Sequence, residues 1–173
     1  MKKLLVVVDM QKDFIDGALG TPEAQAILPA VIEKIAAFEG DVVYTRDTHG
    51  ESYLSTAEGK KLPVVHCVEG TPGWAIHPEV ERAGAGKTAA VIDKPTFGSA
   101  ALADFAQRGG YDAIELIGLC TDICVISNAL LAKAFLPEAE VAVDAACCAG
   151  VTPQSHKTAL AAMKPCQITI ENE

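Results

Sequence analysis

Cys124 is the residue whose position in this sequence best suits covalent chemistry. It follows an apolar run over residues 114–118, which predicts a buried strand ending at a glycine. It also falls in the first turn of a helix predicted over residues 123–135, with Thr121 and Asp122 as capping residues. Free N–H groups and the positive end of the helix dipole lie there, and both favour a thiolate. The alternative is a buried, unreactive cysteine, the commoner fate of a free thiol.

Asp9 and Lys94 follow two other predicted strands, over residues 3–8 and 88–93. In an open parallel sheet the carboxyl ends of the strands meet at one edge, where α/β proteins place their sites. An aspartate and a lysine buried together there would largely cancel their desolvation costs. Beside a thiol, the lysine would lower the thiol pKa and the aspartate could take its proton. The three residues are a candidate nucleophilic site, and a structural Asp–Lys ion pair is the alternative.

Asp47 and His49 form a D-x-H unit after the strand predicted over residues 41–45, and His66 follows in a long insertion. Such a unit can direct both side chains to one side, where a distant histidine can complete a metal site. Imidazole and carboxylate ligands suit Zn²⁺, Fe²⁺ or Mn²⁺. Glu58 is the nearest acidic candidate for a further ligand. By spacing alone this signal is weak, because two histidines are usually ordinary surface residues.

Several other polar residues receive structural interpretations. Asp144 is expected to end a strand beside the site and to orient it. Asp13 and Asp16 are expected on a solvated face, and His156 is expected to be packed or exposed within the last helix. The stretch GAGKT at residues 84–88 has the tail of a P-loop, but it lacks the first glycine and precedes a strand, so we reject it.

Strands and helices alternate along the chain, which predicts one α/β domain over residues 1–173 with a largely parallel sheet. The predicted strands are 3–8, 41–45, 88–93, 114–118, 140–144 and 167–170, and the predicted helices are 22–38, 99–108, 123–135 and 152–163. Residues 50–74 form an insertion without clear periodicity. Loops of that length in a compact domain are often functional.

Composition limits the function classes. A net charge of −9 argues against nucleic acid as a partner. No apolar run is long enough to span a bilayer, and the N-terminus is predicted as a strand rather than a signal peptide, so we expect a cytoplasmic protein. The six cysteines have no framework spacing and no C-x-x-C pair, which favours reduced thiols over disulfides or a zinc ribbon.

Three ordered stretches resemble the isochorismatase-like cysteine hydrolases: VDMQKDF at residues 8–14, KPTF at 94–97 and GLCTDICV at 118–125. The resemblance covers almost the whole chain. It implies a three-layer fold with a six-stranded, mainly parallel sheet and helices on both faces, in dimers or larger assemblies. It also implies that Asp9 is the general base, that Lys94 supports the thiolate and that Cys124 is the nucleophile. A cis peptide between Leu119 and Cys120 is implied too, with the N–H groups of Cys120 and Cys124 forming an oxyanion hole.

Within that family, the D-x-H unit and HCVEGTPG at residues 66–73 resemble the nicotinamidase branch. The resemblance implies that Asp47, His49 and His66 bind a divalent metal, most readily Zn²⁺, that holds the pyridine nitrogen of nicotinamide. Phe14 and Leu119 are expected to line the substrate pocket. The predicted activity is hydrolysis of a small carboxamide through a thioester, with release of ammonia.

Two alternatives stay open. The first is a metal-independent amidohydrolase of the same family that acts on a carbamoyl or ureido compound. The second is a receiver-like signalling module, because a strand-end lysine and Asp9 also suit an acidic phosphoacceptor pocket. That module needs an acidic pair after its first strand, and Asp9 is followed by Met10.

Overall fold

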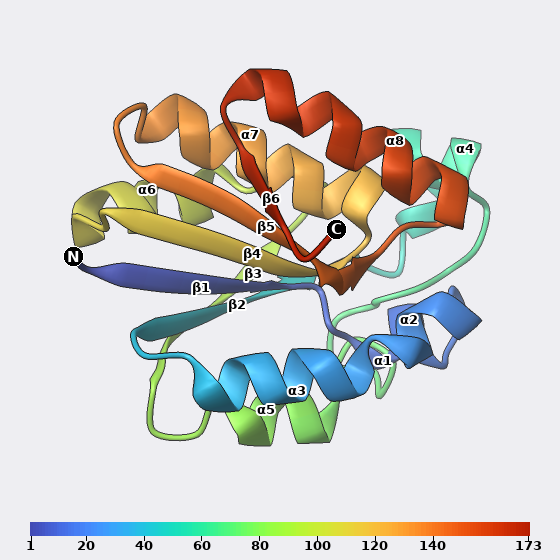
Figure 1. Ribbon diagram of the computed structural model, residues 1–173. Coiled ribbons are helices and arrows are strands. Elements are labelled where there is room, and N and C mark those ends of the chain that lie inside the picture. The colour runs from blue at the N-terminus through green and yellow to red at the C-terminus, as the bar shows by residue number, and fades with distance from the viewer.

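The computed structural model describes residues 1–173 and contains one six-stranded sheet in the order β3-β2-β1-β4-β5-β6 (Figure 1). All five neighbouring pairs are parallel. The strands are β1 (Lys3–Val8), β2 (Asp41–Asp47), β3 (Thr88–Lys94), β4 (Ala113–Leu119), β5 (Glu140–Ala149) and β6 (Thr169–Glu171). The predicted fold class is confirmed, and the carboxyl ends of the strands share one edge.

Helices cover both faces of the sheet (Figure 1). One layer contains α6 (Ala100–Gly109), α7 (Ile126–Phe135) and α8 (Pro153–Met163), and the other contains α3 (Leu28–Ala37) and α5 (Pro78–Ala83). The short helices α1 (Lys12–Ile15), α2 (Pro22–Ala26) and α4 (Ala57–Lys61) gather near the carboxyl edge, with the 3-10 turn η1 (Tyr53–Ser55) beside α4 and a further turn η3 (Lys164–Cys166) after α8. The insertion over residues 50–74 is therefore ordered structure at that edge. None of the helices has the length and apolar character needed to cross a bilayer.

The apolar run of β1 separates two hydrophobic cores. Leu4, Val6 and Val8 pack under the α6–α8 layer, whereas Leu5 and Val7 pack on the side of α3 and α5. Successive side chains of a strand point to opposite faces, so a central strand covered on both faces must be apolar at every position. Burial of this run holds β1 in place up to Val8, and Asp9 therefore lies at the carboxyl edge of the sheet.

The structure corrects two predicted helices. The helix expected over residues 22–38 is interrupted at Ile27, between α2 and α3. Pro29 explains the break, because proline has no N–H to donate and its ring collides with the carbonyl one turn earlier. The helix expected over 123–135 begins instead with a π turn, η2 (Thr121–Val125), and continues as α7.

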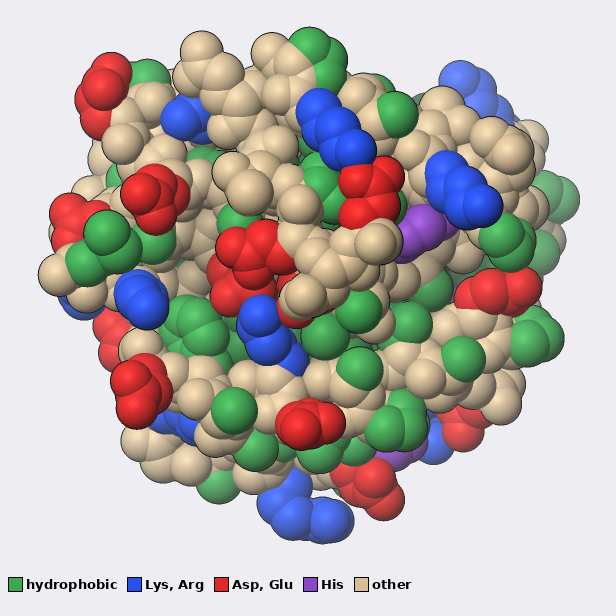
Figure 2. Space-filling model, viewed as in Figure 1, with side chains coloured by type: hydrophobic (Ala, Val, Ile, Leu, Met, Phe, Trp, Pro, Cys, Tyr) green, Lys and Arg blue, Asp and Glu red, His purple; other side chains and the backbone are tan.

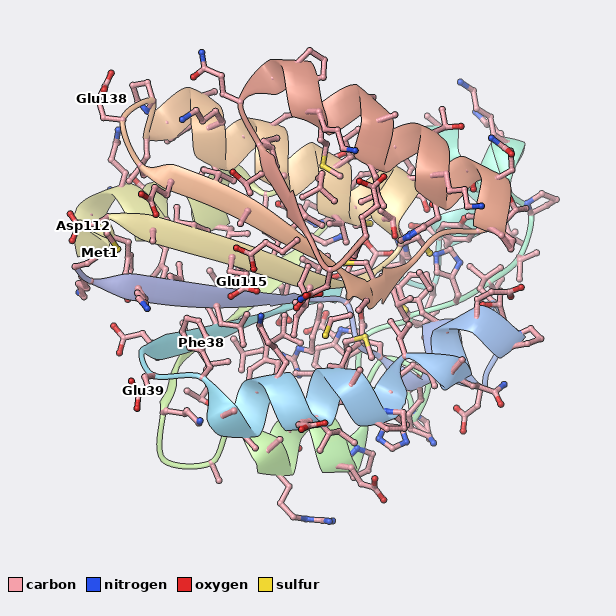
Figure 3. The ribbon with its side chains drawn as sticks, viewed as in Figure 1. Met1, Phe38, Glu39, Asp112, Glu115 and Glu138 are labelled. Carbon is pink, nitrogen blue, oxygen red and sulfur yellow. The ribbon has the colours of Figure 1, made fainter.

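Asp144 does not end a strand beside the site, because β5 continues through a register shift to Ala149. Its carboxylate accepts hydrogen bonds from Lys34 of α3 at 2.9 Å and from Asn172 at 3.0 Å. Lys34 also pairs with Glu115 of β4, which Figure 3 labels over the strands of the sheet. In Figure 2, acidic side chains gather beside a basic one at the middle of this face, above α3. Asp144 thus ties α3 to the sheet.

Gly118 is a position where the sheet tolerates no side chain. Its φ is +113°, and a Cβ there would lie 2.2 Å from the carbonyl oxygen of Val8 on the paired strand. We expect Gly118→Ala to lower the free energy of unfolding by about 3 kcal/mol or more, through backbone strain and the clash. Urea denaturation measures this, with Gly50→Ala as control because a Cβ at Gly50 meets nothing within 4 Å. An equal, small effect of both substitutions would contradict this account of β4.

Candidate active site

The structure brings Asp9, Lys94 and Cys124 together at the carboxyl edge of the sheet. Lys94 Nζ lies 2.7 Å from Asp9 Oδ2 and 3.3 Å from Cys124 Sγ. Asp9 follows β1, Lys94 ends β3 and Cys124 lies in η2 after β4. Because β2 lies between β1 and β3, the lysine side chain has to reach across the end of β2. Asp9 and Lys94 are 0% exposed and Cys124 is 5% exposed.

Lys94 is charged despite its burial. Besides Asp9, its ammonium group lies 3.4 Å from Asp47 Oδ1 and donates to the carbonyl of Thr96 at 3.2 Å. Burial alone would lower the pKa of Lys94, but the negative charges around it, Asp9 first among them, raise that pKa above its ordinary value. A permanent cation therefore sits between the thiol and two carboxylates.

Asp9 has the environment of a base. Burial raises the pKa of Asp9, Lys94 opposes this, and the charge of Asp47 adds to it. Thr45 of β2 donates its hydroxyl to Asp9 Oδ1 at 2.6 Å and accepts the Asp9 N–H at 3.2 Å. The residue adopts a left-handed backbone conformation, with φ +48°. A carboxylate whose pKa is raised accepts a proton more readily, which suits general-base chemistry.

The pKa of Cys124 shifts in the direction opposite to the one expected from the sequence. Burial raises the pKa of the Cys124 thiol well above its ordinary value, and the negative charge of Asp9 raises it further, whereas Lys94 lowers it only in part. Cys124 does lie at the start of a helix, but the first turn, Thr121–Val125, is a π turn that continues directly into α7. A thiol whose pKa is raised needs a base to remove its proton, and Asp9 is the nearby group that can do so.

The expected helix cap is corrected as well. The N-cap residue of η2 is Cys120, which makes no side-chain cap bond. Thr121 instead shares a hydrogen bond with His156 at 2.7 Å, and Asp122 Oδ1 accepts the N–H of Val151 at 3.0 Å. Both predicted capping residues thus connect the turn to the segment that leads into α8.

The backbone around Cys124 is held by neighbouring groups. The peptide between Leu119 and Cys120 is cis, as the resemblance implied. The Cys120 carbonyl accepts the N–H groups of Ile123 and Val125, each at 3.1 Å. Asn128 donates to the Cys124 carbonyl at 2.8 Å. We did not predict a role for Asn128, although a buried amide one turn beyond the cysteine on an apolar helix was an available signal.

Asp47, His49, Glu58 and His66 form the second predicted cluster, and their ligand atoms lie within 4.8 Å of one another. His49 Nε2 is 2.8 Å from Asp47 Oδ2, and His66 Nε2 is 3.6 Å from the same oxygen. Both imidazoles lie 3.7 Å from Glu58 Oε1. Asp47 ends β2 and His49 follows two residues later, whereas Glu58 in α4 and His66 belong to the ordered insertion.

The donor set fits a divalent metal. His66 Nδ1 lies 2.7 Å from the carbonyl of Val64, and donating its N–H there leaves Nε2 with a lone pair facing two carboxylates. A metal-ligating histidine is typically oriented in this way, with its other ring N–H donated to a carbonyl. In a tetrahedral zinc site with ligands at 2.0–2.1 Å, the donor atoms are about 3.4 Å apart. The four histidine–carboxylate pairs are 2.8–3.7 Å apart, and no two donor atoms of the cluster are more than 4.8 Å apart.

Residues that sequence reasoning missed support this cluster. Gln11, buried after β1, accepts the Asp47 N–H at 2.7 Å and donates to the Asp47 carbonyl at 2.8 Å. The ring of Tyr53 packs 4.6 Å from that of His49 and 4.9 Å from that of His66. Asp13, expected on a solvated face, instead accepts the N–H of Cys67 at 2.8 Å and so anchors the insertion.

A cavity of about 220 Å³ joins the two clusters. Cys124 lines it together with three members of the second cluster, and most of the remaining wall is apolar. Phe14 lines the cavity as expected, whereas Leu119 is buried in the core on the α3 side and is not part of the wall. The lining residues are Phe14, Leu19, Thr21, Asp47, Glu58, Leu62, His66, Phe97, Cys120, Ile123, Cys124 and Val151.

Comparison with known protein families assigns the chain. The model of the isochorismatase domain matches residues 3–172. The chain belongs to the isochorismatase family. This confirms the resemblance seen in the three sequence motifs. Nicotinamidase and pyrazinamidase relatives place the chain in the nicotinamidase-like branch of that family.

Relatives of this isochorismatase-family chain include a nicotinamidase/pyrazinamidase of Mycobacterium tuberculosis, 27% identical over 186 residues that cover 97% of each protein. Among solved structures, pyrazinamidase of Pyrococcus horikoshii in complex with zinc has a TM-score of 0.84 and 30% identity, over 98% of each chain. N-carbamoylsarcosine amidase of Thermoplasma acidophilum has a TM-score of 0.77 and 28% identity, over 100% of this chain and 98% of the other. The predicted enzyme class, a hydrolase of an amide C–N bond, is confirmed.

Lys94 is the cation on which the buried charges depend. We expect Lys94→Met to lower the free energy of unfolding by about 3–5 kcal/mol, because Asp9 and Asp47 would remain buried without their partner. Chemical denaturation measures the change, with Lys60→Met as an exposed control expected to stay within about 0.5 kcal/mol. A loss below about 1 kcal/mol for the Lys94 variant would show that the two carboxylates do not need this lysine.

Proposed function

We propose that this chain hydrolyses nicotinamide, or a closely similar aromatic carboxamide, to the carboxylate and ammonia through a thioester on Cys124. The observation that carries the proposal is the single cavity lined by the Cys124 thiol and by the metal-type cluster of Asp47, Glu58 and His66. Its apolar walls suit a flat ring, and its two polar regions suit the reacting amide and a ring nitrogen.

The first step forms the thioester. Asp9 removes the proton of the Cys124 thiol as the sulfur attacks the carboxamide carbon. The backbone N–H groups of Cys120 and Cys124 stabilise the oxyanion that develops on the carbonyl oxygen. When the C–N bond breaks, Asp9 returns the proton to the leaving nitrogen, so ammonia departs and the acyl group remains on the sulfur. Lys94 contacts both Asp9 and the sulfur, and so holds the two side chains close together during this step.

The second step releases the acid. A water molecule takes the place of ammonia, and Asp9 removes its proton as the oxygen attacks the thioester carbon. The C–S bond breaks, the sulfur recovers the proton from Asp9, and the carboxylic acid leaves with loss of its own proton to solvent. Asp9 thus serves both half-reactions, which its raised pKa favours.

Asp47, His49, Glu58 and His66 would hold the metal, Zn²⁺ by preference and Fe²⁺ or Mn²⁺ next. A bound metal ion supplies a Lewis-acid site that accepts a lone pair from the substrate and so orients it. Tyr53 and Gln11 keep the ligands in place, the first by packing on the imidazoles and the second by fixing the backbone of Asp47.

The alternative function within the family is that of a carbamoyl amidase, and the similarity to N-carbamoylsarcosine amidase supports it. The cavity lining includes Asp47 and Glu58 but neither lysine nor arginine. Without a metal, as this alternative requires, a substrate that carries a carboxylate would lack a cationic partner in the cavity lining, so a neutral amide fits better. The receiver-like alternative would need Asp93, next to Lys94 at the third strand, as its phosphoacceptor. Asp93 instead pairs with Arg46 at 2.6 Å in a partly exposed ion pair, so no matching acidic pocket is present.

Loss of the nucleophile is the direct test of the thioester route. We expect Cys124→Ala to reduce ammonia release from nicotinamide by more than about 10³-fold, because the remaining groups cannot form the acyl-enzyme. Cys166→Ala is the matched control, since that thiol is exposed and outside the cavity, and it should retain full activity. Turnover retained by the Cys124 variant would exclude this mechanism.

The metal assignment predicts that the purified protein binds about one equivalent of Zn²⁺ per chain. Removing a ligand should weaken binding: we expect His66→Ala to lower zinc affinity at least about 100-fold, measured by competition with a chromogenic chelator. His77→Ala should leave the affinity unchanged, because His77 caps α5 outside the cluster. A chain that binds no metal, or that binds equally well without His66, would favour the metal-independent alternative.

A further inference from the structure

The turn that carries the nucleophile, Thr121–Val125, is linked to α8 by the side chain of His156, which has no role in the proposed mechanism. His156 lies in the first turns of α8, and its Nδ1 is 2.7 Å from Thr121 Oγ1. Thr121 is completely buried and His156 is partly buried. A hydrogen bond of this length in a buried place holds the threonine side chain in one orientation.

A second bond fastens the next residue of the same turn. Asp122 Oδ1 accepts the N–H of Val151 at 3.0 Å, just before α8 begins. Two consecutive residues of the turn, Thr121 and Asp122, are therefore tied to the segment from Val151 to His156. Since these two residues lie between Cys120 and Cys124, the ties act on the backbone that presents the thiol and both proposed oxyanion-hole N–H groups.

The anchor on the α8 side is itself rigid. Thr152 and Ser155 form a reciprocal capping box at the first turn of α8, which fixes both ends of that turn. The exit of β5 also passes very close to His156: a Cβ on Gly150 would lie 2.8 Å from the His156 nitrogen and 3.0 Å from its Cα. The imidazole thus projects from a backbone that has little room to move.

His156 acts at a distance from the cavity. It is not among the residues that line it, so it does not touch the substrate. Burial lowers the pKa of His156; the charges of Asp122 and Glu173 raise it and that of Lys157 lowers it further. The ring is therefore neutral near neutral pH and can share the bond with the Thr121 hydroxyl without burying a charge.

We propose that His156 is a positioning residue, which through Thr121 holds the turn Thr121–Val125 in the geometry that the acyl-transfer steps require. The kinetic part of this inference rests on the proposed function, whereas the structural part does not. A small displacement of a reacting group lowers the rate of the chemical step many-fold. Greater mobility of the turn Thr121–Val125 should therefore affect the chemical step more than substrate binding.

The test compares His156→Phe, which keeps a ring but removes the bond, with His156→Asn, whose amide can occupy the Nδ1 position. We expect His156→Phe to lower kcat for ammonia release about tenfold with KM changed less than about twofold. Amide hydrogen exchange in the peptide over residues 119–126 should quicken about tenfold. His156→Asn should restore most of both properties, and Thr121→Val should reproduce the defect of His156→Phe without adding to it in the double variant.

His77→Phe is the matched control, because His77 also places its Nδ1 at the start of a helix, α5, on the opposite face of the sheet. It should change neither kcat nor exchange over residues 119–126. Unchanged exchange and kcat in His156→Phe would overturn the proposal. Equal defects in His156→Phe and His156→Asn would also overturn it, since packing rather than the hydrogen bond would then be responsible. A wild-type chain that releases no ammonia would overturn the proposed function, and hydrogen exchange would still decide the role of His156.

Discussion

The architecture of the site follows from one constraint, the burial of the Lys94 ammonium group at 0% exposure. A cation without water must be surrounded by anions and acceptors. Asp9, Asp47 and the sulfur of Cys124 meet this need from three different segments of the sheet edge. Asp47 also contacts His49 and His66 through its other oxygen. Through Lys94, this carboxylate thus links the nucleophile to the metal-type cluster.

The same buried surroundings act on the thiol. Burial raises the pKa of Cys124 most and the charge of Asp9 raises it further, whereas Lys94, which also faces two carboxylates, lowers it only in part. Moving the proton from Cys124 to Asp9 as the bond to carbon forms leaves the total charge of the buried group unchanged. That is favourable where the dielectric is low, because no net charge has to be created in the protein interior.

Much of this arrangement could be predicted from the sequence, because strand ends are visible in it. The apolar run before Asp9 and the strand before Lys94 fix where these residues emerge, and parallel pairing brings them to one edge. The contributions of Asn128, Gln11 and Tyr53 were not predictable, since they depend on contacts between distant segments. Asp144 was misplaced because a strand with a register shift continues past the expected end. The direction of the Cys124 pKa shift was not predictable, because it depends first on burial and then on the opposing charges of Asp9 and Lys94.

The central claim is that the carboxamide carbon becomes bonded to Cys124 during turnover. Rapid acid quenching of the enzyme with saturating nicotinamide, followed by peptide mass spectrometry, tests it directly. The account predicts that the peptide containing Cys124 carries the mass of the nicotinoyl group, and that Cys120 in the same turn stays unmodified. Steady ammonia release with no acyl group on any cysteine, or with the acyl group on another residue, would contradict it.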